Sequence, residues 1–379
     1  MLIKNGKVFA DGVFSYHDLR LTGDRITEIL PIDTLPAPGE EVYEAAGGYV
    51  VPGFIDLQVH GAAGYDFSDA SGEALSAISK HLVRGGVTSY LAASDSFPAE
   101  VLEEAFAAAA PLINQDAGGA VLRGINMTGP FIDPAHHGAQ DERYLREPDL
   151  ELFERLNALS GSAVKILNIS PELPGAKAFI RAVSKSCVVA LTHSGANYDV
   201  SRMGFAYGAR GLSDIYRNME PMDYEDPGLM GAAVDAAGFV TVQPGREFPH
   251  PASLRLAYKV FTDLRMCMVS NSTAFCGLPA GVYLIDNHQV TSDGVAAVFE
   301  DGASAGGVLD LKDCLLLACQ LGGVPLPYLI RSVTETPAKV LGVYDEVGSI
   351  TPGKRADVVV MDLHSMRVKA VFLAGNKIA

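Results

Sequence analysis

Three consecutive segments set the fold class: GFIDLQVH (Gly53–His60), SGEALSAISKHLVRGG (Ser71–Gly86) and VTSYLAAS (Val87–Ser94). The first and third are short apolar runs, which are typical of buried strands. The middle segment is longer than ten residues and repeats its apolar positions at helical spacing. A strand, a helix and a strand in this order predict a βαβ unit, whose two strands lie parallel in one sheet.

The same alternation continues through the middle of the chain. Six further apolar runs are VLRGINMTGP (121–130), AVKILNIS (163–170), CVVALTHSG (187–195), GLSDIY (211–216), FVTVQPG (239–245) and MCMVSNS (266–272). Eight such runs, with helical segments such as PASLRLAYKVFTDLR (251–265) between them, favour an α/β fold of the (β/α)8 barrel type. We expect residues 51–344 to form this barrel domain.

Both ends of the chain have a different pattern. The first fifty residues read as short strands with a hairpin turn at Gly23-Asp24, and GSITPGKRADVVVMDLHSMRVKAVFLAGNKIA (348–379) reads as strands broken by Pro-Gly and Ala-Gly-Asn turns. Neither end is long enough to bury a core alone. We therefore expect residues 1–50 and 345–379 to pair into one small β-sandwich domain.

The composition excludes several classes of protein. The 379 residues include 29 Lys+Arg and 45 Asp+Glu, so the net charge is −16, which argues against a nucleic-acid-binding protein. The segment MLIKNGKVFADGVF (1–14) lacks the apolar region of an export signal, and no apolar stretch is long enough to span a membrane. The five cysteines form no CxxC pair. We expect reduced thiols in a cytoplasmic protein.

The strand ends carry the candidate chemistry, because barrel enzymes place their sites at the carboxyl ends of the strands. These residues are His60, Ser94, Thr128, Ser170, His193, Asp214, the segment 243–247 and Asn271. Two imidazoles with the carboxylates of Asp214 and Glu247 are suggestive of a hydrolytic metal site. Histidines with a purely structural role in the core are the alternative.

Several motifs carry a resemblance to a known family. PGFIDLQVHGAAGYDF (52–67) is similar to the barrel opening of amidohydrolase-superfamily enzymes. The further motifs TGPFIDPAHHGAQ, LTHSGA, IYRNMEP with DPGLMGAA, and TPAKVLGVYDEVGSITPGKRADVVVMD occur in the order found in N-acetylglucosamine-6-phosphate deacetylases. The resemblance runs from end to end. It implies an amidohydrolase barrel and hydrolysis of the C–N amide bond of N-acetylated amino sugars.

The resemblance also implies one divalent metal ion, zinc, iron or manganese, held at three positions. The family's glutamate, histidine and histidine ligands correspond here to Thr128, His193 and Asp214. A hydroxyl is a poor replacement for a carboxylate, whereas aspartate can bind zinc or manganese. His60 is a further candidate ligand, or a residue that contacts the ligands without binding the metal itself. If the site is lost, no metal is expected.

The family's catalytic aspartate corresponds to Asn271. An amide cannot accept a proton at neutral pH, so the group that activates water and protonates the leaving amine is missing. Glu247 is a possible substitute, either as the base or as a third metal ligand.

The implied substrate site is also altered. Glu225 stands where the family has an arginine that meets the sugar phosphate, and Glu247 replaces a histidine. A full set of candidate substrate-binding residues comprises Gln140, Arg217, Asn218, Glu225, Arg246 and Glu247. Arg217 and Arg246 could hold an anionic ligand, or Arg217 could simply pair with Glu220 or Glu225. The family implies a homodimer, in which Gln140 is at the position that reaches across to the other subunit.

Three hypotheses follow. The chain is an amidohydrolase that deacetylates an amino sugar, a noncatalytic relative that binds a sugar or another small ligand, or an enzyme with a rebuilt site and a different substrate. In each, the partner is a small molecule and not a nucleic acid or a membrane.

Overall fold

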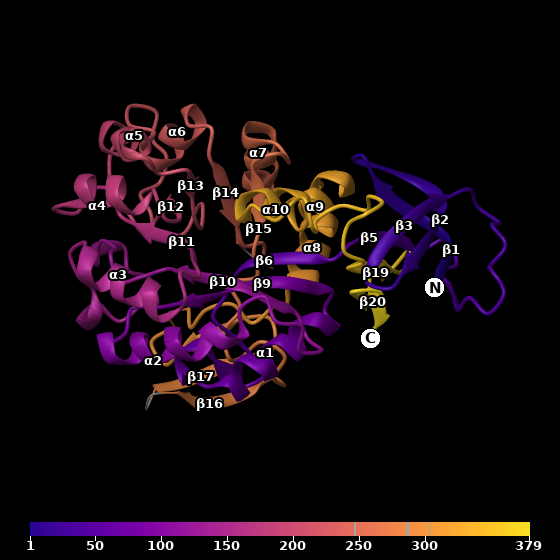
Figure 1. Cartoon of the computed structure of the whole chain (residues 1–379). Helices are drawn as coiled ribbons and strands as arrows, with labels where there is room; N and C mark the ends of the chain where they lie inside the picture. Colours follow the sequence, from indigo (N-terminus) through magenta and orange to yellow (C-terminus); the bar gives the residue numbers. More distant parts are fainter. Residues whose placement is uncertain (246–247, 286–287, 303) are drawn as a thin grey trace.

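A computed structural model describes residues 1–245, 248–285, 288–302 and 304–379. It contains two large sheets (Figure 1). The central sheet has eight parallel strands in the order β15-β14-β13-β12-β11-β10-β9-β6, and a parallel bridge between Val59 and Ser272 closes it into a barrel. Its strands are β6 (Phe54–Val59), β9 (Val87–Ser94), β10 (Val121–Met127), β11 (Val164–Ile169), β12 (Val188–Leu191), β13 (Gly211–Leu212), β14 (Phe239–Val242) and β15 (Met266–Met268). The predicted (β/α)8 barrel is confirmed, and its eight strands lie within the eight predicted runs.

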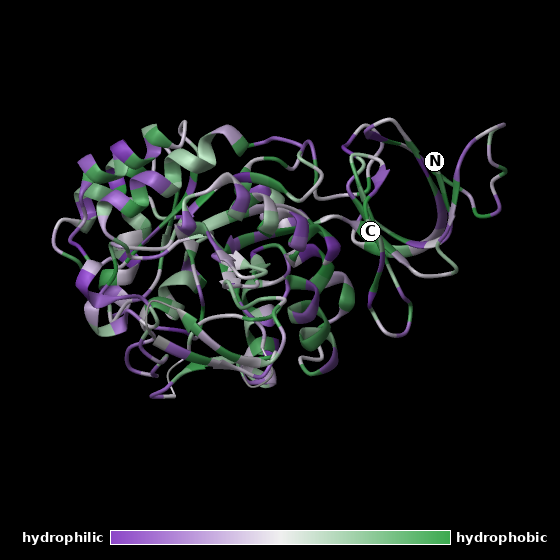
Figure 2. Ribbon diagram, turned by 90° about the horizontal axis from the view of Figure 1, so that it is seen from below, coloured by the Kyte–Doolittle hydropathy of each residue, from purple (hydrophilic) through white to green (hydrophobic). Residues whose placement is uncertain are grey.

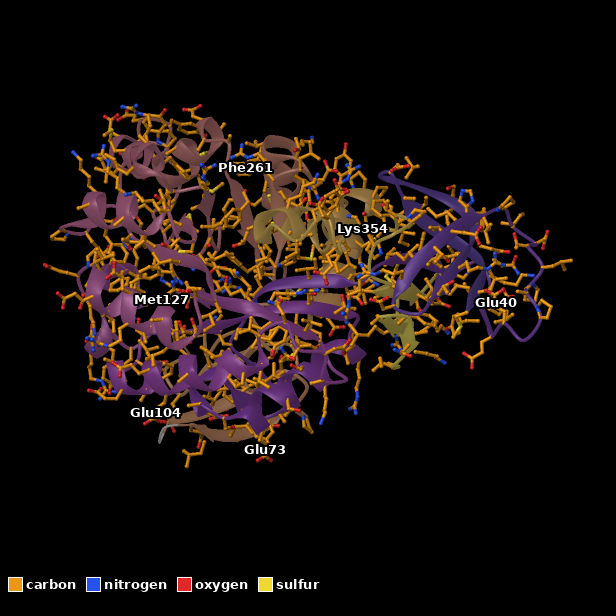
Figure 3. All side chains as sticks on the ribbon, viewed as in Figure 1. Glu40, Glu73, Glu104, Met127, Phe261 and Lys354 are labelled. Atoms are coloured by element: carbon orange, nitrogen blue, oxygen red, sulfur yellow. The ribbon has the colours of Figure 1, made fainter. Side chains whose placement is uncertain are left out.

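Helices cover the outside of the barrel (Figure 1). They are α1 (Gly72–Arg84), α2 (Ala99–Ala109), α3 (Leu150–Leu159), α4 (Ala176–Val183), α5 (Tyr198–Tyr207), α6 (Gly228–Asp235), α7 (Pro251–Phe261), α8 (Leu311–Gln320), α9 (Leu326–Ser332) and α10 (Glu335–Leu341). Each helix buries apolar residues, and purple and green mix along the helices in Figure 2. In Figure 3, Met127 of β10 lies within the body of the molecule, where it is buried, whereas the exposed Glu73 of α1 and Glu104 of α2 lie at its lower edge.

The first helix shows why the sequence folds this way locally. Ser71 caps α1, because its hydroxyl accepts a hydrogen bond from the Ala74 backbone N–H at 3.1 Å. Leu75, Ile78 and Leu82 form the buried stripe of the helix. Gly86 follows with φ +91°, and a Cβ there would lie 2.9 Å from the Phe54 ring, so glycine allows the chain to turn closely into β9.

The second large sheet is built from both ends of the chain. Its path is β21-β20-β19-β5-β1-β2-β3, and β4 pairs with the first residues of β1. The strands are β1 (Leu2–Ala10), β2 (Val13–Thr22), β3 (Arg25–Leu30), β4 (Val42–Glu44), β5 (Tyr49–Pro52), β19 (Val358–Met361), β20 (Val368–Leu373) and β21 (Asn376–Lys377). Figure 1 shows this sheet beside the barrel, with both termini in it. The exact domain boundaries at residues 50 and 345 stay a prediction.

Smaller elements complete the chain. Two short antiparallel sheets pair β7 (Gly61–Ala62) with β8 (Tyr65–Asp66), and join β16 (Gly281–Ile285), β17 (His288–Ser292) and β18 (Ala297–Phe299). Four 3-10 turns lie at Phe67–Asp69, Ala110–Leu112, Pro134–His136 and Glu142–Tyr144. Among the described residues, no helix combines the length and the apolar character that crossing a bilayer requires.

Candidate active site

The predicted site residues gather at the carboxyl ends of the barrel strands. His60, Thr128, His193, Asp214 and Asn271 follow β6, β10, β12, β13 and β15 within three residues. At His193, Asp214 and Asn271 the backbone turns into the left-handed region, with φ of 46°, 54° and 49°. Non-glycine residues seldom adopt this conformation, and such strained positions cluster at functional sites.

One hydrogen-bonded network connects three of these residues. The Gln58 side-chain amide donates to Asp214 Oδ2 at 2.9 Å and to Asn271 Oδ1 at 3.0 Å. His60 Nε2 donates to the same Asn271 oxygen at 2.9 Å, and its Nδ1 lies 3.2 Å from Asp95 Oδ2. Because both ring nitrogens of His60 face acceptor oxygens, the network is complete when His60 is protonated.

The electrostatics of the His60–Asp95 pair support this protonation state. Burial opposes the charge on His60, but the attraction and hydrogen bond of Asp95 outweigh it and raise the His60 pKa to about 9. Burial likewise opposes ionisation of Asp95, and the charge of His60 outweighs it, so the Asp95 pKa is lowered. The Asp95 side chain is 36% exposed, so water screens part of this attraction.

His193 differs from His60 because it is held neutral. Burial lowers its pKa, and its Nδ1 donates to the backbone carbonyl of His136 at 2.7 Å. That hydrogen bond leaves the lone pair on Nε2, which lies 3.5 Å from the Asn218 side-chain amide nitrogen. A Cβ on Gly138 would lie 2.5 Å from that nitrogen, so a glycine is needed for Asn218 to reach this place.

The residues described fit a metal ion poorly. His193 Nε2 and Asp214 Oδ1, which is buried without a hydrogen-bond partner, are two atoms suited to a metal. Thr128 does not supply a third, because its hydroxyl donates to the Ser94 carbonyl beside Asp95. Among the described strand-end residues, no three His, Cys, Asp or Glu ligand atoms lie within 4.8 Å of one another. A catalytic zinc ion ordinarily has three protein ligands.

The candidate substrate residues have different environments. Gln140 is buried, and its amide oxygen accepts from the Ser96 backbone at 3.0 Å, so a reach across a subunit interface would require this bond to break. Glu225 lies exposed on the loop before α6. Glu247 and Arg246 lie outside the described residues, so their predicted roles stay predictions.

Arg217 is not held in the ion pair considered above. Its guanidinium stacks on Phe248 at 4.4 Å, and its buried Nε has no hydrogen-bond partner. Glu220 pairs instead with His136, whose Nε2 lies 3.2 Å from Glu220 Oε1. Among the described residues, no carboxylate forms an ion pair with Arg217.

Sequence reasoning missed Asp95 and Glu172. Asp95 directly follows Ser94 at the end of β9, so the strand-end rule extended by one residue would have found it. Glu172 follows β11, and its carboxylate accepts from Ser194 Oγ at 2.8 Å and from the Gly195 N–H at 2.9 Å. Burial raises the Glu172 pKa. It positions the turn after His193.

Comparison with known proteins identifies the family. Residues 256–378 match the model of the amidohydrolase family. The chain is 30% identical to the N-acetylglucosamine-6-phosphate deacetylase of Bacillus subtilis, over 85% of this chain and 83% of the relative. The chain belongs to the N-acetylglucosamine-6-phosphate deacetylase family. This family lies in the amidohydrolase superfamily, whose members generally use a divalent metal.

Further deacetylases are similar to this chain in sequence or in structure. The N-acetylgalactosamine-6-phosphate deacetylase of Escherichia coli O157:H7 is 28% identical and covers 97% of this chain and 96% of its own. The crystal structure of the deacetylase of Pasteurella multocida has a TM-score of 0.92, with 25% identity over 99% of this chain and 98% of its own. A mutant Mycobacterium smegmatis deacetylase in complex with N-acetyl-D-glucosamine-6-phosphate has a TM-score of 0.91 and 26% identity, covering 100% and 99% of the two chains.

Proposed function

We propose that this deacetylase-family chain binds an amino sugar at the mouth of its barrel and does not hydrolyse the amide by the family's metal-dependent reaction. The observation that carries this proposal is the His60 network, which joins Asp214 and Asn271 through neutral and cationic donors. In this network Asp214 Oδ2 and Asn271 Oδ1 find their hydrogen-bond partners within the protein. The alternative, an active deacetylase, needs a metal ion and a base at these same positions.

Two losses support the absence of the ancestral reaction. Only His193 and Asp214 offer metal-competent atoms among the described family positions, so zinc, iron or manganese is expected to bind weakly or not at all at these strand ends. Asn271 cannot act as the general base, which alone lowers the rate by about 10² to 10⁴. The two losses are chemically independent, and they reduce the same activity.

Arg217 supports retention of an anionic ligand such as a sugar phosphate. Its Nε is buried without a partner, and burial lowers its pKa. A buried guanidinium that lacks a carboxylate partner is stabilised by an anion that forms charge-assisted hydrogen bonds. Arg217 follows Asp214 by three residues at the mouth, where a ligand phosphate or carboxylate can meet it. The resemblance further supports a cytoplasmic location and a homodimer, and the molar mass measured by light scattering would test the homodimer.

Calorimetric titration with N-acetylglucosamine 6-phosphate and with N-acetylglucosamine tests the proposal. We expect the phosphate ester to bind, Arg217→Ala to weaken it at least tenfold, and the exposed control Arg143→Ala to leave it unchanged. Amine release should stay undetectable with added zinc, iron or manganese. Amine release by the wild type at a rate typical of enzymes would overturn the loss of catalysis, and no binding of either sugar would overturn the ligand class.

A rebuilt hydrolase with another substrate is the second candidate, favoured by the unpartnered Asp214 Oδ1 beside the neutral His193. It requires Glu247 as base or third ligand. Screening N-acetylated sugars without phosphate, with Glu247→Ala as the control variant, distinguishes it. Activity that survives this substitution would exclude the rebuilt site.

A further inference from the structure

A second group of metal-ligating side chains lies outside the strand-end site. His81 is in the last turn of α1, Cys276 is in the segment after β15, and Asp310 directly precedes α8. Their ligand atoms all lie within 4.8 Å of one another. Among the described residues, this is the one group in which three such side chains converge.

The distances in this group are close to those of a tetrahedral zinc site. His81 Nε2 lies 2.8 Å from Asp310 Oδ1, Cys276 Sγ lies 3.3 Å from the same oxygen, and Sγ lies 3.8 Å from Nε2. With ordinary zinc–ligand bond lengths, a tetrahedral ion sets such atoms about 3.3–3.6 Å apart. Shifts of about 0.6 Å or less would therefore seat an ion between the three side chains.

The surroundings favour the charged form of Asp310 and the neutral form of Cys276. Burial opposes ionisation of Asp310, but hydrogen bonds and attraction from His81 and Lys312 outweigh it and hold the Asp310 pKa well below its usual range. Lys312 contacts the other carboxylate oxygen, Oδ2, so Oδ1 remains the oxygen that faces His81 and Cys276. The Cys276 side chain is buried, and burial raises the pKa of its thiol, so binding would release its proton.

We propose that His81, Cys276 and Asp310 bind one zinc ion, with water at the fourth position. Cysteine, histidine and aspartate are a ligand set that zinc accepts, and softer or harder ions accept it less well. The ion would tie together α1, the segment after β15 and the start of α8, which are separated by 195 and 34 residues along the chain. It would stabilise the native state, because the unfolded chain has no such preformed site.

This site is independent of the proposed function. None of its three side chains hydrogen-bonds to His60, Asp95 or Asp214 in the described structure. A metal found in the purified protein could therefore come from this group even if the barrel mouth binds none. Variants at the two places separate the two sources.

The experiment uses the full chain, stripped with a chelator and dialysed, then titrated with Zn²⁺ and measured by mass spectrometry of bound metal. We expect one zinc per subunit in the wild type and in Asp214→Ala. Cys276→Ser and His81→Gln should each weaken binding at least about 100-fold, because even substitutions behind a ligand cost 10- to 100-fold. Cys319→Ala is the matched control, since this half-buried cysteine on α8 is outside the group.

A second readout does not depend on the variants being folded. Co²⁺ added to the wild type should give the absorption of cobalt bound to a thiolate, and Zn²⁺ should displace it. Wild type that binds no zinc, cobalt without a thiolate signature, or zinc retained by both Cys276→Ser and His81→Gln would each overturn the proposal. Zinc lost from Asp214→Ala alone would assign the metal to the barrel mouth and would overturn both proposals.

Discussion

At the scale of single residues, the barrel mouth differs from an amidohydrolase centre through a few side chains. By the resemblance of the motifs, Thr128 stands at the family's carboxylate position and Asn271 at the position of its base. In the structure the Thr128 hydroxyl donates to the Ser94 carbonyl. The Asn271 side-chain oxygen accepts from Gln58 and His60. Both side chains are therefore occupied by hydrogen bonds within the protein.

Restoring both family residues tests whether only the catalytic groups were lost. The double variant Thr128→Glu with Asn271→Asp supplies a third metal ligand and a proton acceptor, so we expect measurable deacetylation of N-acetylglucosamine 6-phosphate with added zinc, at least about 10²-fold above the wild type. Amine release and bound metal are the measurements. If the double variant binds one more metal ion per subunit than the wild type but leaves this sugar intact, the pocket has also changed its ligand.

His60 should make stability depend on pH in a predictable direction. Its pKa is raised from 6.5 to about 9 by Asp95, so this pair stabilises the native state fully below pH 6.5 and the contribution is lost as the pH rises through 9. After screening at Asp95 we expect a loss of about 1–2 kcal/mol. Denaturant unfolding at pH 6 and pH 9.5 measures it. Asp95→Asn should reduce the difference in unfolding free energy between the two pH values. An unchanged difference in this variant would exclude the His60–Asp95 pair as its source.

At the scale of elements, short sequence patterns predicted the strands and turns that depend mainly on neighbouring residues. Short apolar runs predicted the barrel strands, and Gly23-Asp24 predicted the turn between β2 and β3. By contrast, β13 and β15 are only two and three residues long, and Asp214 and Asn271 just beyond them adopt a left-handed backbone conformation. The sheet of β16, β17 and β18 was not predicted, since antiparallel pairing depends on partners as much as on pattern.

The cap of α1 gives a test at this scale. Ser71→Ala removes the hydrogen bond to the Ala74 N–H, and we expect a loss of about 1 kcal/mol in the free energy of unfolding. Thermal and denaturant melts measure it. The variant Ser71→Asp keeps a side-chain acceptor at the cap and should retain most of the stability. An equal loss in the aspartate and alanine variants would argue against capping.

At the scale of the whole molecule, one buried ring connects the barrel to the sheet made from the chain ends. Phe54, the first residue of β6, is fully buried in the same cluster as Val359 of β19. Both side chains lie close to the place where a Cβ on Gly86 would be. The contact joins residues that are about three hundred positions apart, and the two sheets therefore share part of one core.

Removing this ring should destabilise both sheets together. We expect Phe54→Ala to lower the free energy of unfolding by about 3–5 kcal/mol, since it leaves a cavity in a packed core. The exposed control Val13→Ala should change it by less than about 0.5 kcal/mol. Calorimetry that shows an unchanged barrel transition in Phe54→Ala would contradict a shared core.

Sequence alone determined the fold class, the family and the strand ends at which to look, because apolar periodicity and motif order are local properties of the chain. Tertiary structure alone decided which groups meet. Gln58 and Asn271 are 213 residues apart, His81 and Cys276 are 195 apart, and no spacing pattern predicts either contact. It also decided the charge of each histidine, because protonation depends on burial and on the atom that faces each ring nitrogen: Asp95 for His60, and a backbone carbonyl for His193.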